Sequence, residues 1–159
     1  MGLAQRIAVI WDGRIEQVGE ASEVFRKPTS TFVAQFVEVE NIFKGRVIRK
    51  EGQMEFNAIF ELNGINIHVF SEIEGEAYIS IRPEEILFSK EKLSSIDYNN
   101  FKGEIIEISD IGSQIKIWVD IGINIVVLVT RLSFLDMDLK IGMPINISFK
   151  PSLLHVFKE

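Results

Sequence analysis

The chain has 159 residues and a net charge of −6, from 17 Lys and Arg against 23 Asp and Glu. An acidic chain lacks the clustered cations that general nucleic-acid binding needs, so no nucleic-acid partner is expected. The absence of Cys excludes thiol catalysis, zinc–thiolate sites, iron–sulfur clusters and disulfides. The chain contains 25 Ile and 13 Val, about 24% of its residues, and this bias favours β-strands over helices.

The first 40 residues predict a β-hairpin followed by two short helices. Asp12-Gly13 lies between two apolar runs, and this dipeptide favours the tight turn of a hairpin. Apolar residues then recur at helical spacing in residues 20–27 and 30–37, and Pro28 separates the two segments.

From Asn41 onwards the apolar residues alternate with period two, and Gly, Asn and Asp separate the short runs. Asn63-Gly64 predicts a second hairpin turn. Residues 89–100 are polar and form the one stretch that could serve as a linker. The pattern predicts strands at residues 44–50, 53–62, 65–70, 77–82, 102–109, 114–121, 123–130, 144–150 and 153–157.

The two sides of this polar stretch repeat each other. Residues 41–48 match residues 99–106 with an offset of 58, and residues 79–83 match residues 147–151 with an offset of 68. The two offsets differ by 10 residues, which indicates an insertion or deletion inside the repeated unit. A mainly β fold with two small tandem barrels is predicted, because barrel closure removes exposed sheet edges.

Three segments near the N-terminus, at residues 3–9, 12–19 and 24–28, resemble the closing stretch of the ATPase domain in ABC-importer ATP-binding subunits. Residues 41–159 resemble the regulatory region appended to such subunits, of the TOBE or molybdate-binding OB-like (MOP) type. The motifs that carry the second resemblance are Ile81-Arg82-Pro83-Glu84, Lys102-Gly103, Gly112-Ser113, Thr130-Arg131, Gly142, Ser148-Phe149-Lys150-Pro151-Ser152 and His155-Val156, and from Lys102 onwards they are most similar to the molybdate and tungstate version.

The resemblance implies three parts: a remnant of an ABC ATPase domain at residues 1–40, a first OB-like unit at 41–92 and a second at 98–159. It further implies that the second unit senses an intracellular oxyanion and modulates transport. The implied partners are a second copy in a homodimer, an ATPase domain upstream of Met1 and a membrane permease subunit. The implied location is the cytoplasm, at the inner face of the cell membrane.

No catalytic residues are expected in these 159 residues, because they contain no Gly-Lys-Ser or Gly-Lys-Thr and hence no P-loop. No cofactor is expected either, since ATP and Mg²⁺ are implied only for the upstream ATPase domain. With two His and no Cys, no transition-metal site is expected. A ligand-free structural or dimerisation module of a sugar, polyamine or iron importer stays open as the alternative function.

A tetrahedral dianion has four acceptor oxygens, so its site needs convergent donors and one or two cations. Lys150 and Ser152 are two residues apart, and on a strand this spacing would point both side chains to one face. The resemblance adds a hydroxyl at Thr130. Asn99 and Asn100 could donate amide N–H groups. However, Asp97-Tyr98-Asn99-Asn100 stands where the family often has Ser-Ala-Arg, and Asp97 adds a repelling charge. The loss of this Arg predicts weaker binding, altered ligand choice or no binding.

Several of these residues also have simpler interpretations. Lys150 could be a solvated charge at a strand end, and Ser152 could be a turn hydroxyl bonded to its own backbone. Glu84 and Glu85 resemble an acid/base pair, but adjacent residues do not face each other, and a proline followed by acidic residues is typical of a helical turn. Arg82, the repeat partner of Lys150, is expected to pair with one of these carboxylates.

Overall fold

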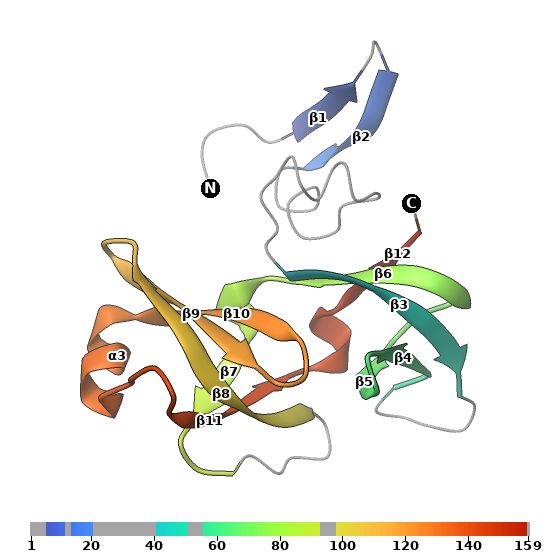
Figure 1. Ribbon diagram of the computed structural model, residues 1–159. Coiled ribbons are helices and arrows are strands. Elements are labelled where there is room, and N and C mark those ends of the chain that lie inside the picture. Colours follow the sequence, from blue (N-terminus) through green and yellow to red (C-terminus); the bar gives the residue numbers. More distant parts are fainter. Residues whose placement is uncertain (1–5, 12–13, 21–40, 51–55, 93–97, 159) are drawn as a thin grey trace.

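The residues that the structure describes form two five-stranded sheets and a separate two-stranded sheet (Figure 1). The structure is a computed structural model, and it describes residues 6–11, 14–20, 41–50, 56–92 and 98–158. β1 (Arg6–Trp11) and β2 (Arg14–Glu20) pair antiparallel, as the hairpin prediction requires. The predicted Asp12-Gly13 turn and the helices predicted at 20–27 and 30–37 lie outside the described residues, apart from Glu20, which ends β2.

The first five-stranded sheet is antiparallel and has the order β12-β6-β3-β4-β5. Between β4 and β5, Asn63 and Gly64 have φ angles of 49° and 78°. Two positive φ angles in a two-residue turn match the hairpin that Asn-Gly predicts. The strands are β3 (Asn41–Arg49), β4 (Ala58–Leu62), β5 (Ile65–Val69), β6 (Gly75–Ile81) and β12 (His155–Phe157).

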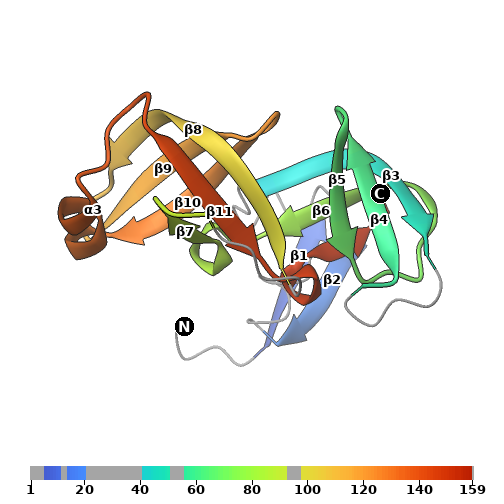
Figure 2. The same cartoon turned by 90° about the horizontal axis from the view of Figure 1, so that it is seen from below.

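The second sheet is also antiparallel and has the order β10-β9-β8-β11-β7. Figures 1 and 2 show α3 (Arg131–Met137), which follows β10, at the outer end of this sheet. The strands are β7 (Leu87–Ser89), β8 (Asn99–Asp110), β9 (Gln114–Asp120), β10 (Asn124–Thr130) and β11 (Pro144–Phe149).

The two halves of the chain exchange their last strands. β7 comes from the first half but pairs with β11, whereas β12 comes from the second half but pairs with β6. Each exchanged strand follows a 3-10 turn that begins with proline, η1 (Pro83–Glu85) before β7 and η2 (Pro151–Leu153) before β12. Each predicted unit therefore gives one strand to the other's sheet, and the boundaries at 1–40, 41–92 and 98–159 stay a prediction.

One cluster of buried side chains includes residues of both sheets, from Val47 and Phe60 in the first to Ile105 and Phe149 in the second. Ile and Val dominate this cluster, as the composition predicts for pleated, half-buried strands. The prediction of a mainly β, OB-like fold is therefore confirmed. Among the described residues, no helix has the length and apolar character needed to cross a bilayer.

The repeat is visible in the element order, and α3 accounts for its change of offset. Residues 70–74 connect β5 to β6, whereas residues 131–143, which contain α3, connect β10 to β11. The sequence pattern predicted neither α3 nor β7. Leu132 and Leu135 of α3 are 70% and 64% exposed, whereas Phe134 and Met137 pack against the core cluster, so the leucines do not mark the face that packs. β7 has three residues, too few for a period-two pattern.

Candidate functional site

Two buried asparagines connect the sheets in the same way. Asn41 Nδ2 donates to the Val126 carbonyl and its Oδ1 accepts from the Val126 amide, both at 2.8 Å. Asn99 makes the same pair of bonds with the His68 backbone, at 2.9 and 2.8 Å. Both the asparagines and their partners are 58 residues apart, so the repeat builds this contact twice. Asn99, a predicted oxyanion ligand, is thus bonded to the backbone through both ends of its amide.

The predicted cation, Lys150, lies close to Asn99, because Phe149 pairs with Asn99 in the sheet. Nζ of Lys150 is 5.5 Å from the centre of the Tyr98 ring, and no ion pair of this ammonium is found within the described residues. Asn100 lies opposite Ser148 in the sheet register and accepts a 2.9 Å hydrogen bond from its hydroxyl. Lys150, Asn99 and Asn100 therefore meet where β8 begins and β11 ends.

Ser152 lies on the next turn, η2, and lines a depression of about 520 Å³. Arg82 also lines it, and Arg82 Nε donates to Glu84 Oε1 at 2.9 Å, which confirms the expected pairing. Glu72 and Glu85 belong to the same lining. Because two carboxylates would repel a dianion, this depression suits an oxyanion poorly.

Thr130 lies at the N-terminus of α3, where its hydroxyl caps the helix. Thr130 Oγ1 accepts from the Ser133 amide at 3.1 Å and donates to the Ser133 hydroxyl at 3.0 Å. The two hydroxyls thus lie side by side. Ser133 was not predicted, although its spacing of three residues from a capping Thr is the signal that could have found it.

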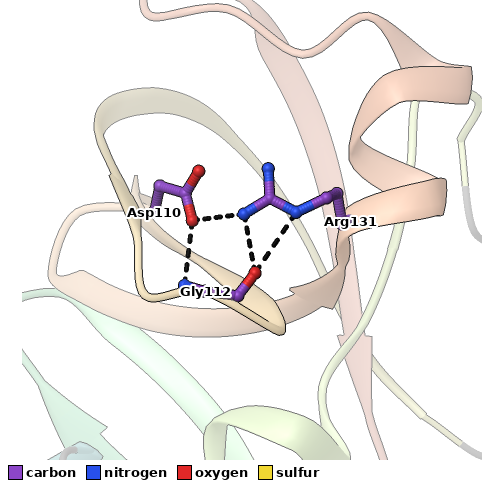
Figure 3. Close-up of polar contacts among 3 residues, drawn as sticks. All are labelled: Asp110, Gly112 and Arg131. Atoms are coloured by element: carbon purple, nitrogen blue, oxygen red, sulfur yellow. Dashed lines mark hydrogen bonds and ion pairs between the residues drawn. The ribbon is translucent and has the colours of Figure 1, made fainter.

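Arg131 fixes the start of α3 to the loop between β8 and β9 (Figure 3). Its guanidinium donates to Asp110 Oδ1 and to the Gly112 carbonyl, and the Gly112 amide donates to the same Asp110 oxygen at 2.9 Å. The hydrogen bond from Arg131, followed by that from Gly112, holds the pKa of Asp110 below its ordinary value. This arrangement sets the position of Thr130.

The five predicted residues fall into two groups within one copy of the chain. Asn99 pairs with Phe149 at one end of β8, whereas Asp110 at the other end binds Arg131, next to Thr130. β8 is about 35 Å long between these two ends. One copy therefore brings together Asn99, Asn100 and Lys150, with Ser152 one turn away, and places Thr130 elsewhere.

Comparison with protein families gives a match to the TOBE domain over residues 79–157. These residues belong to the TOBE domain family. The TOBE match begins in β6 and ends with β12, so it includes both exchanged strands.

Relatives extend this relationship along the chain. The chain is 33% identical to the molybdate/tungstate import ATP-binding protein WtpC of Pyrococcus abyssi over 158 residues, 99% of the chain and 44% of the relative. WtpC of Pyrococcus horikoshii is 31% identical with the same coverage, and the spermidine/putrescine import ATP-binding protein PotA of Trichormus variabilis is 34% identical over 80% of the chain and 35% of its own length. The chain spans less than half the length of these relatives.

A solved structure supports the fold. The molybdate-bound cytoplasmic molybdate-binding protein ModG has a TM-score of 0.62 over 77% of this chain and 98% of its own, at 19% identity. The TOBE match and the relatives confirm the predicted resemblance to the TOBE-bearing region of ABC-importer ATP-binding subunits, most like the molybdate/tungstate type.

Proposed function

We propose that this chain is the regulatory region of an importer's ATP-binding subunit and that it binds a tetrahedral oxyanion, molybdate or tungstate, to modulate transport. The match over 99% of the chain to proteins named for molybdate/tungstate import carries this proposal. The role is one of binding, and ATP hydrolysis belongs to an ATPase domain on the same subunit, which acts with a membrane permease.

The placement of the donors favours a site built by two copies of the chain. Lys150 supplies a cation without an acidic partner in the described part, and Asn100 lies beside it. Thr130 and Ser133 supply adjacent hydroxyls at the other end of the sheet. A dianion needs donors on several sides, so Lys150 of one copy and Thr130 of the next would complete the site.

Such a site can regulate only if oxyanion affinity differs between two arrangements of the assembly. A site shared between copies meets this condition, because it is complete in one arrangement of the pair and open in another. Ligand binding would then stabilise the arrangement in which Lys150 and Thr130 face the same anion.

Calorimetric titration of the protein with molybdate, and with sulfate for comparison, tests the proposal. The parent should bind molybdate, and Lys150→Ala should weaken binding at least about tenfold because it removes a charge-assisted contact. Lys140→Ala is the matched control, since Lys140 is exposed and pairs with Asp138 at 3.5 Å. No heat at millimolar molybdate, or equal affinity of parent and Lys150→Ala, would contradict oxyanion binding through Lys150.

The alternative is a structural or dimerisation module without a small ligand. It is favoured by the double hydrogen bond that engages Asn99, a position where the resembling family often has a donor for the anion. PotA proteins are named for import of polyamines, which are cations, so relatives of this chain also include importers with other cargo. Absence of molybdate binding by the intact parent would support this alternative.

A further inference from the structure

A second depression lies on the outer face of the second sheet, and we call it the lysine hollow. Its volume is about 490 Å³. No carboxylate is among the described residues that line it, although the whole chain has a net charge of −6. The lining consists of Lys90, Lys92, Asn100, Phe101, Lys102, Pro144 and Asn146.

Strand pairing fixes the floor of the lysine hollow. Asn146 of β11 lies opposite Lys102 of β8 on one side and opposite Ser89 of β7 on the other. Asn146 Nδ2 donates to the Lys90 carbonyl at 3.3 Å, which holds the chain after β7 beside the hollow. Lys90, Lys92 and Lys102 are exposed, and none of their ammonium groups has an ion pair within the described residues.

The repeat provides an internal comparison for this floor. By the two offsets, Asn100, Asn146 and Ser89 correspond to Ile42, Tyr78 and Phe157 of the first sheet. Those three side chains pack together, with the Tyr78 and Phe157 rings 5.7 Å apart. The first sheet therefore has an apolar floor where the second has amides and a hydroxyl.

The lysines themselves have partial counterparts. Lys102 corresponds to Lys44, and Lys90 corresponds to Lys158. Two lysines at these positions are thus common to both sheets, whereas the polar floor beneath them belongs to the second sheet alone among the described residues. The combination of cations with hydrogen-bonding amides is what distinguishes the lysine hollow.

We propose that the lysine hollow binds a polyphosphate group, either as free pyrophosphate or as the phosphate chain of a nucleotide. Three ammonium groups match an anion that carries several charges on linked tetrahedra. Asn146 Nδ2 donates one N–H to the Lys90 carbonyl and has a second N–H for the oxygens of the anion. The volume is within the usual range for small-molecule sites and larger than one tetrahedral anion needs. The lysine hollow shares Asn100 with the proposed oxyanion site, but Lys150 is absent from its lining, so variants of Lys150 distinguish the two proposals.

Titration with sodium pyrophosphate at low ionic strength, followed by calorimetry and ³¹P NMR, tests this site. The parent should bind, and the double variant Lys90→Gln/Lys102→Gln should bind at least about tenfold more weakly. The matched control is Lys44→Gln/Lys158→Gln, which removes the same charge over the apolar floor and should change the affinity less than about twofold. ATP should bind like pyrophosphate, and adenosine should not bind.

Equal weakening in both double variants would overturn the proposal, because it would indicate attraction to the overall charge. Unchanged binding in the first double variant, or no binding by the parent at millimolar pyrophosphate, would do the same. Lys150→Ala should leave pyrophosphate binding intact, and its loss there would contradict the assigned location. The substituted lysines are exposed, so unchanged circular dichroism should verify that the variants fold.

Discussion

Asn41 and Asn99 illustrate how much can depend on one polar side chain in an apolar core. Both are buried, at 0% and 4% exposed. Each hydrogen-bonds to the backbone N–H and carbonyl of a residue on an edge strand. Asn41 bonds to Val126 on β10, and Asn99 bonds to His68 on β5. Because an unpaired edge is open to pairing with another chain, the two asparagines protect the edges as well as joining the sheets.

Replacing Asn41 should therefore destabilise the fold strongly. Asn41→Ala leaves the N–H and carbonyl of Val126 buried without partners, so we expect a loss of roughly 2–4 kcal/mol in unfolding free energy, measured by urea denaturation. Asn124→Ala, at an exposed position of β10, is the control and should stay within about 0.5 kcal/mol. A similarly small effect of Asn41→Ala would contradict the role assigned to this amide.

The contact between Arg131 and Asp110 should give a measurable pH dependence. Folding lowers the pKa of Asp110. The ionised Asp110 carboxylate therefore stabilises the fold above the ordinary carboxyl pKa of 3.8, and this stabilisation is lost as the pH falls through the lowered pKa. In an NMR titration, Arg131→Gln should move the Asp110 midpoint up towards 3.8. Lys44→Gln, on the first sheet, should leave it unchanged. An Asp110 midpoint that does not respond to Arg131→Gln would refute the contact.

At the residue scale, the sequence predicted contacts between neighbours in the chain better than contacts between distant residues. The pairing of Arg82 with Glu84 followed from neighbours in the chain, and the structure confirms it. The engagement of Asn99 with His68 could not be foreseen, since the two residues are 31 positions apart and meet only after both sheets form. Long-range contacts of this kind leave no local pattern.

At the scale of elements, one glycine in each repeat allows neighbouring strands to approach closely. A Cβ at Gly103 would lie 2.5 Å from the Asp120 carbonyl oxygen and 2.8 Å from the Val119 side chain. A Cβ at Gly45 would collide with the Glu61 carbonyl and the Phe60 ring.

Gly45→Ala and Gly103→Ala should each destabilise the protein by about 1–3 kcal/mol, because the added methyl group overpacks a close strand contact. The comparison is Lys44→Ala, next to Gly45 but exposed, for which a change within about 0.5 kcal/mol is expected. Denaturation of all three by urea gives the differences. If the glycine variants matched Lys44→Ala in stability, the packing account of these strands would be wrong.

The strands and the repeat could be predicted because period-two alternation and Asn-Gly turns are local signals. β7 and α3 could not, since β7 has three residues and gains its place by pairing with β11, and α3 exposes its leucines. The exchange of β7 and β12 was also beyond the sequence pattern. Alternation shows that a segment is a strand, but it does not select the sheet that receives it.

At the scale of the whole molecule, the exchanged strands and paired asparagines make each sheet depend on both halves of the chain. The first sheet needs β12 from the C-terminal end, and the second needs β7 from before residue 92. The same rigidity keeps Thr130 and Lys150 apart, because β8 separates them within one copy. An oxyanion site that uses both residues therefore requires two copies of the chain.

Mixing two variants that each bind molybdate weakly tests most directly whether two copies of the chain share the oxyanion site. Thr130→Val and Lys150→Ala should each bind molybdate weakly alone. In an equilibrated equal mixture of pairs, half would be mixed, and each mixed pair would contain one intact site of Lys150 from one copy and Thr130 from the other. Calorimetry should then recover about a quarter of the parent's tight molybdate sites. Recovery of none would contradict a site shared between two copies.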